Sequence, residues 1–157
     1  MRDYRKDKEF MDCVRDIYTA EIFRREEEFI QHGTTTTFDH SLDVAYMTFL
    51  ICKERGWDAR AGARAGMLHD FFLYDWHKPA RETGGYFHGF THPFAAARNA
   101  KRYFRITPKE ENMIKTHMFP LTLLPPLSKE GWVLTYADKY CTCVEFFKRL
   151  LPSFGGV

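Results

Sequence analysis

The sequence predicts an all-α protein of five to six helices. Apolar residues recur at helical spacing over most of the chain, and strand-like alternation of polar and apolar residues is nearly absent. Good helix-capping residues also stand at the starts of several of these segments. The 157 residues, 45% of them hydrophobic, are enough for one hydrophobic core. We therefore expect a single domain over residues 1–157.

The first expected helix has Phe10, Val14 and Ile17 on one face, with charged residues on its other side. This helical pattern breaks over residues 31–36. The core of the domain is accordingly expected at about residues 34–150, with the first helix preceding it.

The second and third expected helices lie close together in the sequence. The second begins near Thr37, a good N-cap residue, and ends at Gly56. Asp58 caps the third helix, which runs to about Phe72. Because alanine and glycine dominate one face of this third helix, another helix can approach it closely.

Residues 73–90 contain a proline and several glycines, which indicates irregular structure. The fourth helix is then expected to begin at Thr91. Pro93 falls in its first turn, where the missing N–H group costs nothing.

The last two helices have clear starts. Thr107 and Glu110 form a capping box with Pro108 at the first helical position, which marks the start of a short fifth helix. A final helix is expected to begin near Ser128 and to end before Pro152.

Composition and charge exclude several classes of function. Lys and Arg number 23 against 21 Asp and Glu, a net charge of only +2 without any basic run, so polymeric nucleic acid is not expected as the main partner. No stretch approaches the ~18 consecutive apolar residues that span a bilayer, so no membrane partner is expected. The N-terminus lacks the apolar segment of a signal peptide. We therefore expect a cytoplasmic protein with reduced cysteines.

Cys141 and Cys143 are two residues apart in the final expected helix. At that spacing two side chains point in roughly opposite directions, which disfavours a shared metal ion.

Five of the expected helices each carry at least one potential metal ligand. Imidazole nitrogen and carboxylate oxygen together suit Fe, Mn, Ni or Zn. Taken singly, each residue also fits a hydrogen-bonded structural role; taken together, four histidines and two aspartates are enough to hold two ions. The candidates are His40, His69, Asp70, His92, His117 and Asp138.

This ordered set resembles the HD-domain superfamily of metal-dependent hydrolases, whose signature is a His, a His-Asp doublet and a distal Asp. Here these positions are His40, the doublet His69-Asp70, and Asp138, with a step of 29 positions from His40 to His69. The resemblance covers residues 34–150. It implies an HD-domain-like helical bundle that holds divalent metal and, in most characterised members, hydrolyses phosphoester bonds, often in nucleotides.

Members of the superfamily that bind two metals have two further histidines between the doublet and the last Asp, an interval that here contains His92 and His117. The resemblance therefore implies one or two divalent transition-metal ions: Fe, Mn, Ni, Co or Zn. It assigns one ion to His69, Asp70, His92 and His117, and the other to His40, Asp138 and a bridging Asp70.

The chain departs from the family pattern after the doublet. Many members continue with Gly-Lys or place an acid soon afterwards, whereas here only Asp75 is available as such an acid. The candidate catalytic residues are therefore the bridging Asp70 and Asp75. Asp75 fits two roles equally well: a general acid or base, or an ion-pair partner of Lys78 or Arg81.

A phosphorylated substrate needs positive charge or hydrogen-bond donors opposite the metal. His88 lies in a glycine-flanked segment that fits either a lid over the substrate or an ordinary surface loop. The candidate substrate-binding residues are Lys139, His88, Arg81 and Lys115.

The sequence thus predicts a metal-dependent phosphohydrolase that cleaves a phosphoester of a small phosphorylated molecule with metal-activated water. A nucleotide is one candidate substrate. Two alternatives stay open: an HD-type di-iron oxygenase with the same ligands, and a non-catalytic metal-binding or sensory module. The oligomeric state is not predicted.

Overall fold

The computed structural model describes residues 4–32, 34–75, 77–78 and 87–150. The protein is 71% helical, and the expected all-α class is confirmed. None of the described helices is long and apolar enough to cross a membrane. The described elements include seven α-helices, two 3-10 helices and two short strands: η1 (Tyr4–Lys6), α1 (Lys8–Tyr18), α2 (Glu21–Arg24), η2 (Arg25–Glu28), β1 (Ile30–His32), β2 (Thr35–Thr36), α3 (Thr37–Glu54), α4 (Ala59–Leu68), α6 (His88–Tyr103), α7 (Pro108–Thr116) and α8 (Lys129–Leu150).

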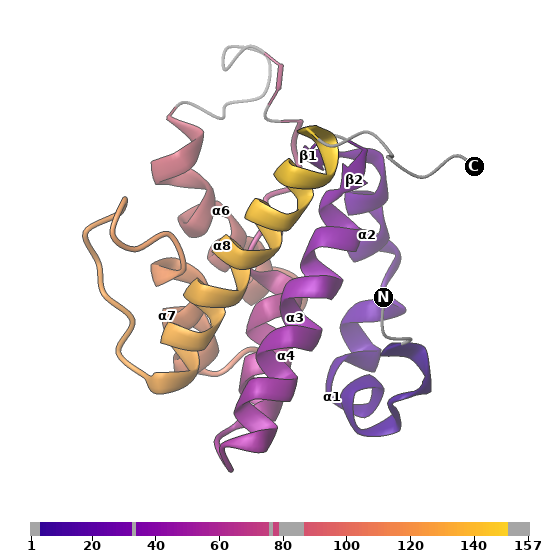
Figure 1. Ribbon diagram of the computed structural model, residues 1–157, viewed down its shortest axis with the longest axis vertical. Coiled ribbons are helices and arrows are strands. Elements are labelled where there is room, and N and C mark those ends of the chain that lie inside the picture. Colours follow the sequence, from indigo (N-terminus) through magenta and orange to yellow (C-terminus); the bar gives the residue numbers. More distant parts are fainter. Residues whose placement is uncertain (1–3, 33, 76, 79–86, 151–157) are drawn as a thin grey trace.

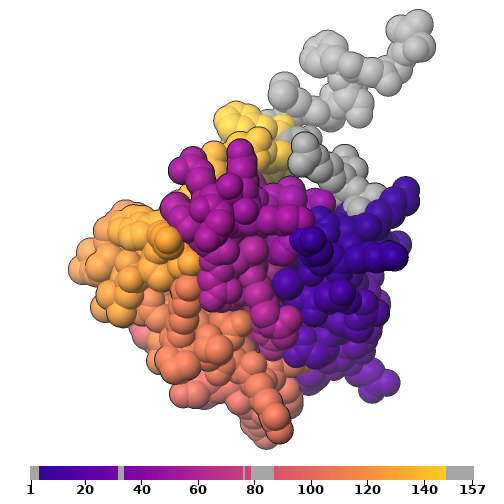
Figure 2. Space-filling view, turned by 90° about the horizontal axis from the view of Figure 1, so that it is seen from below, coloured from indigo at the N-terminus to yellow at the C-terminus, as the bar shows by residue number. Residues whose placement is uncertain are grey.

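Helices α3, α4 and α8 form the centre of the bundle, with α1 and α2 on one side and α6 and α7 on the other (Figure 1). The core contains apolar side chains from the N-terminal segment as well as from the central helices. Phe10, Val14, Ile17 and Phe23 have no exposed surface. In the space-filling view, this N-terminal segment lies directly against α3 and α4 (Figure 2).

The N-terminal segment differs from the single helix expected there. Helix α1 ends at Tyr18 and is followed by the C-cap Thr19, whose backbone N–H and side-chain hydroxyl both donate to the carbonyl of Arg15. Ala20 is extended, so the chain restarts as α2 and η2. Residues 31–36, expected only as a break, contain most of a short antiparallel hairpin of β1 and β2.

The helix starts follow local capping chemistry where a cap exists. Asp58 caps α4 as expected, and the capping box of Thr107 and Glu110 begins α7. Helix α3 is capped by Thr36, one residue before the expected position, and Thr37 is instead buried. Helix α4 ends at Leu68 rather than near Phe72.

The start of α6 was predicted wrongly. The helix begins at His88 rather than at Thr91, and Pro93 lies inside it. Its N-cap, Phe87, has a positive φ of 51° and makes no side-chain capping bond. A start of this kind has no signal in the residue types, because phenylalanine has no side-chain acceptor that could cap the first N–H groups of the helix.

Helices α3 and α4 approach each other closely at Gly66. A Cβ atom placed on Gly66 would lie 2.5 Å from the Cα atom of Ala45. A glycine is therefore required there, and this contact confirms the close approach expected from the small residues of α4. It also places the end of α4, and the residues that follow it, against the first turns of α3.

We expect Gly66→Ala to destabilise the protein by about 1–3 kcal/mol or more, because the added methyl group must displace backbone atoms of α3. The matched control is Gly62→Ala, whose Cβ would lie 3.1 and 3.3 Å from side-chain atoms of Thr48 and Cys52 and 3.7 Å from the nearest backbone atom, the Thr48 carbonyl oxygen. Urea unfolding of both variants measures the difference. Equal losses in the two variants would contradict the argument.

Glu26 on η2 is a fully buried carboxyl group. Its Oε1 atom accepts the N–H of Leu73 at 3.2 Å, and its Oε2 atom is buried without a hydrogen-bond partner. Burial raises the pKa of Glu26 to about 8; the bond from Leu73 opposes this rise, and the nearby charge of Asp70 adds to it. The carboxyl group is therefore neutral in the folded protein at pH 7.

The Glu26 carboxyl makes stability depend on pH. Its pKa is about 8 in the folded protein and about 4.3 in the unfolded chain. The contribution of Glu26 to the free energy of unfolding is fully present below the pKa of the unfolded chain. As the pH rises toward the pKa of the folded protein, this contribution falls by about 1.4 kcal/mol per pH unit. We expect Glu26→Gln to be more stable than the unsubstituted protein at pH 8 and no more stable at pH 4.5. Denaturant unfolding of chelator-treated protein at both pH values tests this, with the exposed Glu27→Gln as a control that shows no such crossover.

Candidate metal centre

Six buried side chains from five segments of the fold meet at one place. They lie on α3, just after α4, on α6, just after α7, and on α8. Each has at most 7% of its surface exposed. They are the six candidate ligands of the sequence: His40, His69, Asp70, His92, His117 and Asp138.

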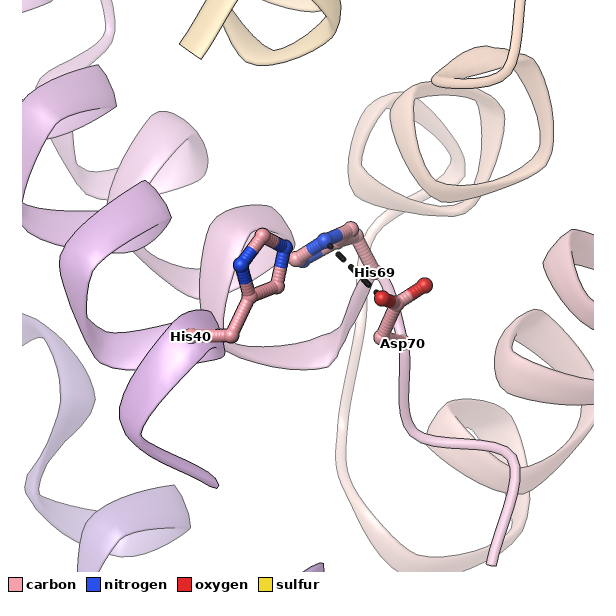
Figure 3. A group of neighbouring side chains, drawn as sticks. All are labelled: His40, His69 and Asp70. Atoms are coloured by element: carbon pink, nitrogen blue, oxygen red, sulfur yellow. Dashed lines mark ion pairs between the residues drawn. The ribbon is translucent and has the colours of Figure 1, made fainter. Parts of the chain in front are cut away.

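The first group of ligands lies between α3, α4 and α8. The imidazoles of His40 and His69 point toward one another and toward Asp70 (Figure 3). Asp138 Oδ1 lies 3.2 Å from His40 Nε2 and 3.6 Å from His69 Nε2. Asp70 Oδ2 lies 3.5 Å from His69 Nε2. Four donor atoms therefore converge without any intervening apolar group.

The second group uses the other oxygen of the same carboxylate. Asp70 Oδ1 lies 3.2 Å from His92 Nε2 and 3.6 Å from His117 Nε2. The two imidazole nitrogens are 3.0 Å apart. Asp70 thus faces both groups, one oxygen to each, which is the arrangement of a bridging ligand.

The geometry divides the ligands differently from the expectation. His69 was expected with His92 and His117, but its Nε2 atom belongs to the group of His40. The reason is a hydrogen bond of 2.7 Å between His69 Nδ1 and the carbonyl of Gly66, one turn earlier. This bond fixes the ring so that Nε2 faces Asp70 and Asp138.

The Nδ1 atom of every ligand histidine is held by a partner outside the two groups. Three donate to backbone carbonyls: His69 to Gly66, His92 to His88 at 2.8 Å, and His117 to Ile114 at 2.7 Å. A neutral histidine that donates from Nδ1 presents a lone pair at Nε2, so these bonds leave Nε2 of each ring as the atom available to a metal. His40 differs, because its Nδ1 atom pairs with the Glu145 carboxylate at 2.9 Å.

These hydrogen bonds leave donor atoms that the protein alone does not satisfy. The Nε2 lone pairs of His92 and His117 face each other at 3.0 Å. His69 Nε2 and Asp70 Oδ1 are buried without hydrogen-bond partners. Lone pairs that converge in this way repel one another unless a cation lies between them. The two donor sets, nitrogen with carboxylate oxygen, fit divalent transition metals.

The electrostatics keep the carboxylates ionised. Burial alone would raise the pKa of Asp70, but the imidazoles of His69 and His92 hold it well below its usual range. Burial and the neighbouring His69 and His92 lower the pKa of His117 to about 3, so His117 is neutral. Burial would also lower the pKa of His40, but Asp138 and Glu145 raise it to about 10. A metal at the first group therefore displaces a proton from His40.

A cavity of about 310 Å³ opens beside the centre. Lys139 Nζ donates to the His117 carbonyl at 3.0 Å, and burial lowers the pKa of this ammonium group. His88 contacts the Tyr74 hydroxyl at 3.0 Å, and burial, with His92, lowers its pKa to about 4. The polar groups of the cavity wall thus include the Lys139 ammonium and the neutral imidazoles of His88 and His117. The lining comprises Gln31, Asp70, His88, Gly89, His92, His117, Met118, Asp138, Lys139, Thr142 and Cys143.

Two of the four candidate substrate-binding residues, Lys139 and His88, line this cavity. Lys115 does not; it pairs with Glu111 at 2.6 Å and lines a separate hollow on α6 and α7. Arg81, and most of the glycine-flanked segment expected as a lid or loop, lie outside the described residues. His88 itself is the first residue of α6.

Asp75, the candidate acid after the doublet, is not part of the lining that the described residues form. Its Oδ1 atom accepts the N–H of His77 at 3.0 Å, and its Oδ2 atom lies 4.0 Å from Lys78 Nζ. This arrangement corresponds to the ion-pair alternative. Of the two candidate catalytic residues, only Asp70 lies at the cavity.

Sequence reasoning missed two residues that contact the ligands. Glu145 follows Asp138 by seven residues, about two helical turns, so a search of that helix face could have found it. Gln31 donates from Nε2 to Asp70 Oδ2 at 2.5 Å. Nothing in the sequence around Gln31 signals this contact.

Comparison with protein-family models matches residues 37–143 to the HD domain. The chain belongs to the HD-domain family. The matched part of this HD domain contains all six ligand candidates, and the superfamily is one of metal-dependent hydrolases. Gln31 precedes the match and Glu145 follows it. A search of curated proteins and a search of solved structures gave no match.

We expect Glu145→Gln to weaken binding of the metal at the His40 group about 10–100-fold, because a neutral amide polarises the imidazole less than a carboxylate does. Titration with Zn²⁺, followed by calorimetry, measures the change. Glu111→Gln serves as the control, because the Glu111 carboxylate lies on α7 and pairs with Lys101 and Lys115. Unchanged affinity in Glu145→Gln would show that the contact with His40 does not tune the ligand.

Proposed function

We propose that this HD domain is a metal-dependent phosphohydrolase that cleaves a phosphoester bond in a small phosphorylated molecule, with a nucleotide as one candidate. One observation carries the proposal. Two groups of nitrogen and oxygen donors share Asp70, and part of each group lies in the wall of a cavity that also contains Lys139.

The size and charge of the cavity support a small anionic substrate. About 310 Å³ is at the lower end of the range of small-molecule sites, about 300–1,000 Å³. The cation of Lys139 stands in the same wall as the ligands His117 and Asp138. An anion that reaches the centre therefore meets the positive charge of Lys139 in addition to that of the metal ions.

The first group, His40, His69, Asp70 and Asp138, would hold one ion, and His92, His117 and Asp70 would hold the other. Divalent ions bound there supply Lewis acidity: they lower the pKa of bound water and polarise a phosphoryl oxygen. His40 and His69 are absent from the cavity lining, whereas His92 and His117 belong to it. Substrate in the cavity therefore lies nearest to the second group.

The side chains of the cavity bind and orient the substrate. Lys139 donates to a phosphoryl oxygen from the wall, as a charge-assisted hydrogen bond. His88 is neutral and its Nδ1 atom is held by Tyr74, so it contacts the substrate without adding charge. No step is assigned to Asp75, because it does not line the cavity.

We expect purified protein loaded with Mn²⁺ to hydrolyse at least one member of a panel of phosphomonoesters, phosphodiesters and nucleotides. Lys139→Ala is expected to raise KM about tenfold or more, because a hydrogen bond from a charged donor contributes about 1.5–3 kcal/mol. Its metal content stays unchanged. Lys115→Ala is the matched control, since Lys115 lies in a separate hollow; it keeps the parent KM.

Two results would contradict the proposal. If metal-replete protein hydrolyses no ester on the panel and the iron-loaded form consumes oxygen, the results favour an oxygenase that uses the same ligands. Bound metal with neither activity would favour a binding or sensory module.

A further inference from the structure

Gln31 lies in β1, before the part of the chain that matches the HD domain, and its side chain reaches the metal centre. It is 7% exposed and belongs to the lining of the cavity. The segment that carries it packs against the central bundle through Phe10, Val14 and Ile17. These side chains lie on α1; next to the hairpin itself, the backbone N–H of Thr37 on α3 donates to the Phe29 carbonyl at 2.8 Å.

Two hydrogen bonds fix the orientation of the Gln31 amide. The Thr37 hydroxyl donates to Gln31 Oε1 at 3.2 Å. Gln31 Nε2 donates to Asp70 Oδ2 at 2.5 Å. Because an ionised carboxylate can only accept, the end of the amide that faces Asp70 is Nε2, which leaves Oε1 facing the Thr37 hydroxyl.

The bond from Gln31 distinguishes the two oxygens of Asp70. It goes to Oδ2, the oxygen that lies 3.5 Å from His69 Nε2. Oδ1, which faces His92 and His117, has no hydrogen-bond partner. A terminal carboxylate torsion is broad and weakly restrained by itself. A donor fixed on one oxygen therefore also fixes the direction in which the other oxygen points.

We propose that Gln31 is a positioning residue for Asp70: by holding Oδ2, it keeps Oδ1 aimed at His92 and His117, so that one carboxylate serves both metal groups. This inference rests on the metal centre of the proposed function. Gln31 is not itself a ligand in this scheme. Its loss affects the His92 group more than the His40 group, because Asp138 still completes the latter.

The test is a Mn²⁺ titration of the full chain, followed by metal analysis and by electron paramagnetic resonance. Two Mn²⁺ ions that share a carboxylate give an exchange-coupled spectrum, whereas separate ions give the signal of isolated Mn²⁺. The variant is Gln31→Met, which keeps the length of the side chain and removes its amide. The matched control is Thr35→Ala on the partner strand of the hairpin.

We expect Gln31→Met to bind its first equivalent of Mn²⁺ as the parent does and its second about 10–100-fold more weakly, as is typical when the partner of a ligand is removed. The coupled spectrum is lost at two equivalents, and Thr35→Ala retains it. A second variant, Thr37→Val, leaves the Gln31 side chain in place but frees its amide, and gives a smaller weakening of the same equivalent. Circular dichroism and thermal unfolding establish that each variant is folded.

Several results would overturn the inference. If folded Gln31→Met binds two equivalents with parent affinity and a coupled spectrum, Gln31 does not position Asp70. If both equivalents weaken alike in Gln31→Met and in Thr35→Ala, the effect comes from the hairpin as a whole. If the parent protein binds no pair of ions, the proposed centre fails first and the role of Gln31 with it. Parent protein that binds the pair and hydrolyses esters, beside an unchanged Gln31→Met, overturns the inference alone.

Discussion

The carboxylate of Asp70 belongs to both donor groups of the candidate metal centre. Its oxygens lie 3.5 Å from His69 Nε2 on one side and 3.2 Å from His92 Nε2 on the other. An ionised carboxylate buried to this degree is costly unless positive charge compensates it. The surrounding imidazoles can supply that charge only when protonated, which is incompatible with lone pairs at Nε2. The arrangement is therefore consistent when cations occupy both groups.

The position of Asp70 depends in turn on the packing of α3 against α4. The contact of Gly66 with Ala45 brings the end of α4 within reach of His40, which lies one and a half turns before Ala45. The carbonyl of Gly66 then orients the ring of His69. One glycine thus serves both the helix contact and the ligand geometry. A bulkier residue there would disturb the ligands without touching any of them.

The six candidate ligands could be selected from the sequence because their order along the chain resembles a family signature, and the structure brings them together. The starts of α4 and α7 could be predicted because Asp58 and Thr107 cap their own helices locally. The division of the ligands into two groups could not be predicted from the sequence. It depends on how the ring of His69 is turned by the carbonyl of Gly66. The contact of Gln31 with Asp70 joins residues 39 positions apart, and neither residue type indicates such a contact.

Helix α8 carries both the ligand Asp138 and the partner of His40, Glu145, at a separation of seven residues. Seven residues make almost two full turns, so both carboxylates face α3, one above the other. The imidazole of His40 is held between them, at 3.2 Å from the first and 2.9 Å from the second. Insertion of one residue between the two acids would rotate the second carboxylate by about 100° around the helix axis and remove its contact with His40. An acidic residue seven positions after the distal Asp is therefore a criterion that can be applied to other HD-domain sequences. Sequences with this residue are expected to place a carboxylate on each side of the first histidine, and sequences without it are not.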